Sequence, residues 1–190
     1  AGLVYSLESG AMNEGFSDCW GAIIENYANP FESDAVAKQM WYIGEEIDAG
    51  NPLRRMDNPN LKNQPDTYGG TWWFNVSSCT PGTANDYCGV HQNSGVFNYW
   101  FYLLTNGGSG TNDVGNAFSV TGVGATKAAN ILYNTELVLS STADYATMRA
   151  TSITVATTLY GSCAPEVIAV TKAWYAVNVG ANFTSTVPSA

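Results

Sequence analysis

Three carboxylates share one face of the first predicted helix. Helical spacing of apolar residues predicts a helix over residues 6–27, and at about 100° per residue Glu14, Asp18 and Glu25 fall within roughly 40° of one another. No lysine or arginine occurs in this segment, so no cation within the helix compensates these charges. Either water solvates this face or an outside cation neutralises it. Gly15, beside Glu14, leaves room for another element or a metal ion to approach.

The chain has a single histidine, His91, on a glycine-flanked turn before a predicted helix. Asp86 can fold back onto a ring nitrogen and fix the tautomer, which suits a residue that donates a hydrogen bond to a developing oxyanion. A structural role is the alternative interpretation of a lone histidine. A catalytic zinc ion takes three protein ligands and a water molecule, so one histidine and one glutamate leave it a ligand short. Further histidine ligands would have to come from elsewhere.

The pattern of the whole chain is typical of a mainly α fold. After the first helix, residues 28–89 are rich in Asn, Pro, Gly and Asp and read as irregular, with residues 69–77 as the best strand candidate. Four more helices are predicted: one capped by Asn93 or Ser94 and stopped by Gly107 and Gly108, one near residues 125–139 after a glycine-rich turn region at 107–122, one from Ser141 or Thr142 to Gly161, and one from Pro165.

Composition narrows the class of protein. The 190 residues carry a formal net charge of −9, and 45% of them are hydrophobic, which is enough to build a core. An acidic chain repels phosphate backbones and anionic lipid, so we expect neither nucleic acid nor a membrane surface as a partner. No apolar run approaches the roughly 18 residues of a membrane span. The chain opens at Ala1 rather than at Met and looks like a processed piece of a longer protein.

The cysteines indicate an oxidising compartment. No C-x-x-C pair occurs, and few charges with many aromatic and small polar residues favour a secreted, extracellular protein. Cys79 and Cys88 close a short loop of turn-forming residues and are the leading disulfide candidates. Cys19 and Cys163 are candidates for a second bridge, although four cysteines allow three pairings.

Two motifs carry a family resemblance. N-E-G-F-S-D at residues 13–18 and G-V-H-Q-N-S-G at residues 89–95 resemble segments of the thermolysin-like zinc metallopeptidases, and the similarity extends over nearly the whole chain. The resemblance implies a mainly α fold of about five helices, namely the C-terminal lobe of a bilobed peptidase. Residues 1–190 would form a single domain with a long loop region at about 28–92.

The resemblance also assigns roles to individual residues. Glu14 resembles the third zinc ligand, and Asp18 resembles the carboxylate that orients a zinc-bound histidine. His91 resembles the imidazole that stabilises the tetrahedral intermediate, Tyr5 its hydroxyl companion, and Asp86 the carboxylate that holds the imidazole. Zinc and its histidines would then be the positive partners that the carboxylate face lacks.

Further positions resemble the substrate-binding parts of the family. Arg54 resembles the arginine that binds a backbone carbonyl of the substrate. Ile43, Ile47 and Leu53 resemble part of an apolar pocket for the residue after the scissile bond, which implies a preference for a bulky hydrophobic residue there.

One element of the family pattern does not occur in these 190 residues. The His-Glu-x-x-His segment, which supplies two zinc ligands and the general base, would lie ahead of Ala1 in the family. We therefore expect the chain to be the C-terminal half of a secreted zinc metalloendopeptidase. Its partners would be the N-terminal lobe of the same peptidase and a peptide or protein substrate, and the chain alone would be inactive.

A calcium site is a weaker expectation. Glu25 and Glu45 match positions where the family gathers carboxylates around calcium, but Met40 and Tyr42 stand where acidic residues would be expected. Calcium needs six to eight oxygen ligands, so solvated acidic surface is the preferred interpretation.

A non-catalytic peptide- or glycan-binding module with the peptidase fold is the rival hypothesis. Trp72, Trp73 and Phe74, beside Tyr68, can stack on sugars or extended peptides, or can form a hydrophobic cluster beneath the loop between the two cysteines. A degenerate module would be expected to have lost site residues, and the candidates are all present: Tyr5, Glu14, Arg54 and His91.

Overall fold

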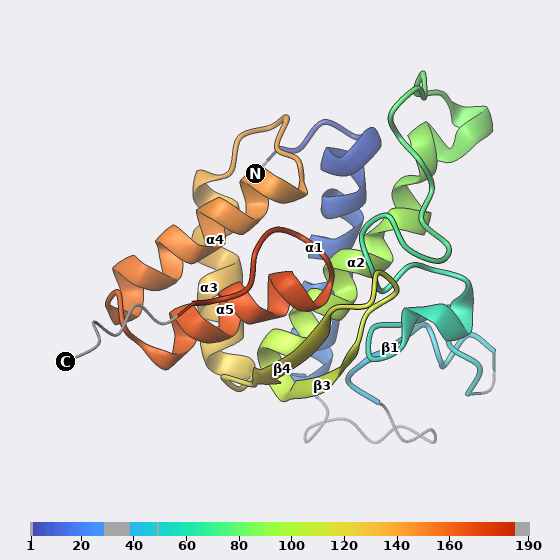
Figure 1. The fold of residues 1–190 in the computed structure, drawn as a ribbon. Coiled ribbons are helices and arrows are strands. Elements are labelled where there is room, and N and C mark those ends of the chain that lie inside the picture. Colours follow the sequence, from blue (N-terminus) through green and yellow to red (C-terminus); the bar gives the residue numbers. More distant parts are fainter. Residues whose placement is uncertain (1, 29–38, 49, 185–190) are drawn as a thin grey trace.

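The computed structural model describes residues 2–28, 39–48 and 50–184 (Figure 1). Its helices are α1 (Leu7–Ala28), α2 (Asp86–Asn106), α3 (Ala125–Val138), α4 (Tyr145–Tyr160) and α5 (Pro165–Ala176), with short 3-10 helices at Pro59–Lys62 and Thr83–Asn85. The strands are β1 (Tyr42–Ile43), β2 (Arg54–Arg55), β3 (Gly107–Thr111) and β4 (Ala117–Thr121). The predicted mainly α fold, with five helices and a long irregular segment between the first two, is confirmed.

Helices α1 and α2 lie side by side and form the centre of the molecule (Figure 1). The ring of Phe16 on α1 packs against Phe97 on α2, with centroids 4.8 Å apart. Gly15 permits this approach, because a Cβ at that position would lie 2.6 Å from the Phe97 ring. The packing of apolar faces sets α1 against α2 and so brings the two predicted motifs to one region of the fold.

The three C-terminal helices complete the core: α3 and α5 contact α2, and α4 packs on α3 and α5. Trp174 on α5 stacks on Trp100 of α2 with centroids 4.3 Å apart, and Trp100, Trp174 and Tyr145 are all almost completely buried. Tyr145 opens α4, where the side chain of Asp144 caps the helix by accepting from Thr147 N. The expected start at Ser141 or Thr142 is therefore three to four residues early, because the cap comes from Asp144.

The glycine-rich region after α2 is a β-hairpin, which corrects the expectation of a turn region. β3 and β4 pair antiparallel, with Gly107 opposite Thr121 and Thr111 opposite Ala117. β3 is rich in glycine and most of its residues are exposed. Neither an alternation of apolar and polar residues nor β-propensity therefore marks this strand in the sequence. Its backbone pairing with β4 and the contacts of the hairpin with α2 and α5 define it.

The strand predicted at residues 69–77 is wrong. The segment runs as turns and extended backbone, and Trp72 has a φ of 65°. The backbone of this segment pairs with a side chain and not with a strand. The amide of Asn93 accepts from Phe74 N at 2.9 Å and donates to Phe74 O at 2.9 Å. Asn93 is thus a buried residue within α2 and not the cap of this helix, and Ser94 is buried beside it.

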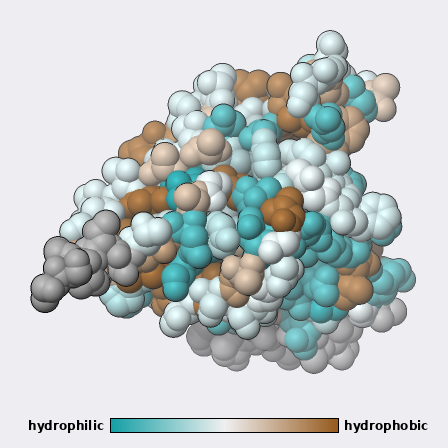
Figure 2. Space-filling view, in the orientation of Figure 1, coloured by the Kyte–Doolittle hydropathy of each residue, from teal (hydrophilic) through white to brown (hydrophobic). Residues whose placement is uncertain are grey.

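The disulfide between Cys79 and Cys88 is present and confirms the leading pairing. The second candidate pairing is wrong, because Cys19 is a buried free thiol inside the core and Cys163 is an exposed one. Within the described residues, no helix combines the length and apolar character that a bilayer span requires. The face drawn in Figure 2 is mostly hydrophilic or neutral, with its hydrophobic residues in scattered patches.

Candidate active site

The tertiary structure brings Tyr5, Glu14 and His91 into mutual contact. Tyr5 Oη donates a short hydrogen bond to Glu14 Oε1 and lies 3.3 Å from His91 Nε2. His91 Nε2 lies 3.4 Å from Glu14 Oε2. Partial burial and the Glu14 carboxylate raise the pKa of Tyr5, so its hydroxyl stays protonated and remains a donor. The cluster joins an oxygen ligand of the kind zinc accepts to two potential hydrogen-bond donors.

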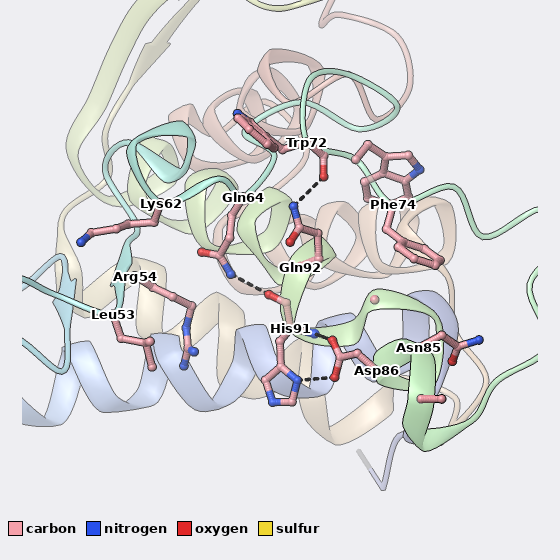
Figure 3. A pocket seen from close by; sticks show the side chains of 13 residues that line it. Leu53, Arg54, Lys62, Gln64, Trp72, Phe74, Asn85, Asp86, His91 and Gln92 are labelled. Carbon is pink, nitrogen blue, oxygen red and sulfur yellow. Dashed lines mark hydrogen bonds and ion pairs between the residues drawn. The ribbon is translucent and has the colours of Figure 1, made fainter.

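Asp86 holds His91 at two points. Its Oδ1 lies 2.6 Å from the ring Nδ1, and its Oδ2 accepts from the backbone N of His91 at 2.9 Å. Figure 3 shows the ring facing this carboxylate, while Gln64 reaches the His91 carbonyl oxygen from the opposite side at 2.6 Å. A carboxylate on Nδ1 fixes the tautomer and the ring orientation, and so leaves Nε2 directed at Tyr5 and Glu14.

The backbone that carries Asp86 is a left-handed turn at the start of α2. Asp86, Tyr87, Cys88 and Gly89 have φ values of 54°, 49°, 72° and 71°. At Gly89 a Cβ would lie 2.7 Å from the side chain of Phe74, so this glycine also allows close packing. Regular α2 geometry follows this turn, upstream of the predicted start at Asn93 or Ser94.

Asp18 has a cationic partner in this chain, which the sequence interpretation did not anticipate. Arg54 on β2 donates from Nε to Asp18 Oδ2 at 2.8 Å and from Nη2 to Oδ1 at 2.6 Å. Asn98 on α2 donates to Asp18 Oδ2 at 2.8 Å. Burial lowers the pKa of Arg54, but the hydrogen bonds and charge of Asp18 outweigh burial and leave the pKa raised. The carboxylate face is therefore neutralised in part by β2.

β2 is placed for this contact by its pairing with β1, in which Ile43 stands opposite Arg54. Ile43 packs against the hydrophobic core. Ile47 and Leu53 are largely exposed and line a cavity of about 280 Å³ together with Lys62. The three predicted pocket residues thus do not line one cavity, because the alternation along β1 and β2 turns Ile43 inward.

A larger cavity of about 630 Å³ lies beside the cluster of Tyr5, Glu14 and His91. It is lined by Leu53, Arg54, Trp72, Asp86 and His91, among others, and several of these side chains appear in Figure 3. Leu53 lines both cavities. Arg54 and His91 thus border the same cavity.

The metal-ligand set of the described residues is incomplete. No group of three or more His, Cys, Asp or Glu side chains that could hold a metal ion occurs in the part of the chain that the structure describes. Glu14 fits one oxygen position of a zinc site, and His91 Nδ1 is engaged by Asp86. For calcium, Glu45 is buried and accepts from Gln39 N, while residues 30–38, the neighbouring stretch, lie outside the described residues.

Comparison with known proteins decides the family. The model described as "Thermolysin metallopeptidase, alpha-helical domain" matches residues 1–179. The chain belongs to the thermolysin metallopeptidase family. This confirms the resemblance inferred from residues 13–18 and 89–95.

Relatives in this family match over almost the whole chain. Bacillolysin of Bacillus caldolyticus and thermolysin of Alicyclobacillus acidocaldarius are each 40% identical over 184 residues, which cover 94% of this chain and 30% of theirs. The precursor of protealysin from Serratia proteamaculans superposes with a TM-score of 0.63 at 27% identity, covering 95% of this chain and 52% of that chain. The chain thus spans about a third of the length of the curated relatives it matches.

Two site residues escaped the sequence interpretation. Asn98 binds Asp18, and Gln64 binds the His91 backbone; both are buried. Asn98 lies between Phe97 and Trp100 in an apolar part of α2. A polar side chain at such a position must find a buried partner, and this is the sequence signal that could have identified Asn98. Gln64 lies in an irregular segment that offers no comparable periodicity.

Proposed function

We propose that this chain is the C-terminal, α-helical lobe of a secreted zinc metalloendopeptidase and supplies part of the active site. The contact of Tyr5, Glu14 and His91 beside the larger cavity carries this proposal. Membership in the thermolysin metallopeptidases supports it, since Glu14 and His91 stand in the two motifs of the family resemblance. The partner is the N-terminal lobe of the same peptidase, which contributes the histidine ligands and the general base.

In the assembled site, Glu14 provides one oxygen ligand to zinc, which when bound polarises the scissile carbonyl and activates water. With Asp86 on Nδ1, the His91 ring would present Nε2, and Tyr5 its hydroxyl, to the place where negative charge develops on the carbonyl oxygen. Arg54, oriented by Asp18, binds a backbone carbonyl of the substrate and sets the register of the extended chain.

The substrate is a peptide or protein with a bulky hydrophobic residue after the scissile bond. Leu53 and Ile47 leave apolar surface exposed beside Arg54, and a large apolar side chain would cover it. Covering such surface stabilises the bound peptide by about 25 cal/mol per Å².

The full-length protein tests the roles with two variants and two measurements. His91→Ala is expected to lower kcat by about 10² to 10³ while zinc stays bound, because it removes an oxyanion donor. Glu14→Ala is expected to release zinc. For each variant and for the unmutated enzyme, atomic absorption gives the zinc content. The kcat is measured on two peptides, one with Leu and one with Ser after the scissile bond. Loss of zinc from His91→Ala, or equal cleavage of the two peptides by the unmutated enzyme, contradicts the assignment.

The aromatic segment bears on the rival hypothesis of a non-catalytic binding module. Trp73 packs on Tyr68 with centroids 4.4 Å apart, and the Phe74 backbone is held by Asn93. Trp72 is the exposed member of the three. The segment therefore contributes mainly to packing, and a stacking platform built from all three rings is disfavoured.

A further inference from the structure

The start of α2 contains an unusual run of backbone conformations. Four successive residues, Asp86 to Gly89, have φ values between 49° and 72°, and three of them are not glycine. Side-chain-bearing residues rarely adopt this left-handed region, because Cβ crowds the backbone. Such a run persists only where surrounding contacts hold it.

A loop closed by the disulfide supplies these contacts. Cys88 is bonded to Cys79, and its backbone N–H donates to the side chain of Asn85 at 3.2 Å. Asn85 also accepts from Gly82 N and donates to the carbonyl oxygen of Thr80. Residues 79–88 are thus cross-linked to one another by covalent and hydrogen bonds, and this loop ends inside the left-handed turn.

The same turn places Asp86. Its carboxylate binds both the ring and the backbone N–H of His91, so any rotation of the Asp86 backbone moves the carboxylate away from both groups at once. A right-handed or extended conformation at residues 86–88 would redirect the side chain. The conformation of the turn therefore controls the orientation of the His91 ring.

We propose that the loop of residues 79–88 is a positioning element for His91: the Cys79–Cys88 disulfide and Asn85 keep the turn left-handed and thereby hold Asp86 against the imidazole. Cys79, Cys88 and Asn85 are positioning residues, since none of them contacts the cluster of Tyr5, Glu14 and His91. The catalytic consequence rests on the proposed function, whereas the control of the ring orientation stands apart from it.

A disulfide can also stabilise a protein merely by restricting the unfolded chain, and one pair of variants separates the two roles. C79S/C88S and C79S/C88G both lack the cross-link and so lose that restriction. Glycine adopts positive φ without steric cost, whereas serine does not. The positioning role therefore predicts that serine at residue 88 lowers kcat and disturbs the His91 ring, and that glycine at residue 88 restores both. A purely cross-linking role predicts that glycine restores neither.

In the full-length enzyme, C79S/C88S is expected to lower kcat about tenfold or more with KM within about twofold, because the oxyanion donor is misplaced while peptide contacts remain. C79S/C88G is expected to recover to within about threefold of the unmutated enzyme. Cys163→Ser, which removes an exposed free thiol far along the chain, is the control and is expected to change neither constant. Unchanged kcat in C79S/C88S, or no recovery in C79S/C88G, overturns the proposal.

A second readout does not depend on peptidase activity. His91 is the single histidine of the 190-residue chain, so its ring Nδ1 proton can be assigned without ambiguity by NMR at fixed pH. One sharp downfield signal is expected for the unmutated chain and for C79S/C88G, and a broadened or missing signal for C79S/C88S. If circular dichroism shows that C79S/C88S is unfolded, the variant Asn85→Ala replaces it in both measurements. Asn85→Ala keeps the disulfide but removes the acceptor of the Cys88 N–H.

The two readouts keep the proposals distinct. If the unmutated full-length protein cleaves no peptide, the proposed function fails, and the ring signals still decide whether the loop positions His91. An unchanged Nδ1 signal in C79S/C88S, or in Asn85→Ala where that variant replaces it, overturns the positioning role whatever the activity.

Discussion

Two adjacent arginines on β2 form ion pairs in different environments. Arg54 binds Asp18 through two nitrogens, and the exposed fractions of the two side chains are 17% and 5%. Arg55 binds Asp57 with equally good geometry, but both side chains are more exposed, at 22% and 23%. Asn98 adds a third hydrogen bond to Asp18 only. Removal of one partner from a buried pair leaves an uncompensated charge, whereas solvent screens the more exposed pair.

At the residue scale, Asp18→Ala is expected to lower the free energy of unfolding by about 3 kcal/mol, because Arg54 would keep its burial and lose its counter-charge. Asp57→Ala is the matched control and is expected to cost about 1 kcal/mol or less. Urea unfolding of the 190-residue chain, followed by circular dichroism, measures both. Equal costs for the two variants would refute the distinction between the pairs.

At the element scale, α2 organises the loop segment as well as the core. Asn93 is completely buried and binds both backbone groups of Phe74, as a neighbouring strand would. Its own carbonyl oxygen accepts from Tyr145 Oη at 2.8 Å, which ties the same turn of α2 to α4. Because Phe74 also packs on Gly89, this contact joins the segment before the disulfide to the turn that carries Asp86.

Asn93→Ala is expected to lower the free energy of unfolding by about 2–4 kcal/mol, because it leaves the N–H and C=O of Phe74 without partners. The backbone amide of Phe74 is also expected to exchange its hydrogen faster. Asn134→Ala is the control, because the half-buried Asn134 side chain donates to the Asn130 carbonyl oxygen within α3, and it is expected to change stability by no more than about 0.5 kcal/mol. Urea unfolding and hydrogen exchange by NMR give the two measurements, and unaltered protection of Phe74 would rule out the role given to Asn93.

At the scale of the whole molecule, our proposal gives this chain only one part of a metal site. Its 190 residues include one histidine and four cysteines, two of which form a disulfide. A catalytic zinc site takes three protein ligands and leaves a fourth position for water or substrate. Glu14 supplies one ligand, and His91 is engaged by Asp86, so the remaining ligands belong to the partner lobe in our proposal.

The purified 190-residue chain, supplied with zinc, is therefore expected to cleave no peptide under conditions in which the full-length protein does. The reason is the incomplete ligand set together with the lack of a general base placed on metal-bound water. A fluorogenic peptide assay with and without a chelator makes the comparison. Hydrolysis by the chain alone that a chelator suppresses would refute this expectation.

Helices and local motifs were within reach of sequence reasoning because their determinants are short-range. Apolar residues at helical spacing and glycine or proline breakers identify α1 to α5, with errors confined to two starts: α2, where a left-handed turn precedes the regular helix, and α4, where Asp144 is the cap. The Cys79–Cys88 pairing and the approach of Asp86 to His91 also join residues no more than nine positions apart. The family motifs lie within single segments of six or seven residues.

Contacts between distant segments were decided only by the tertiary structure. Tyr5 and His91 are 86 residues apart, and Asp18 and Arg54 are 36 apart, so their meeting depends on how α1 packs on α2 and how β1 pairs with β2. The left-handed turn at residues 86–89 and the binding of Phe74 by Asn93 run against local propensity and exist because neighbouring contacts hold them. Side-chain types and spacing therefore determined which groups are available, and packing determined which of them meet.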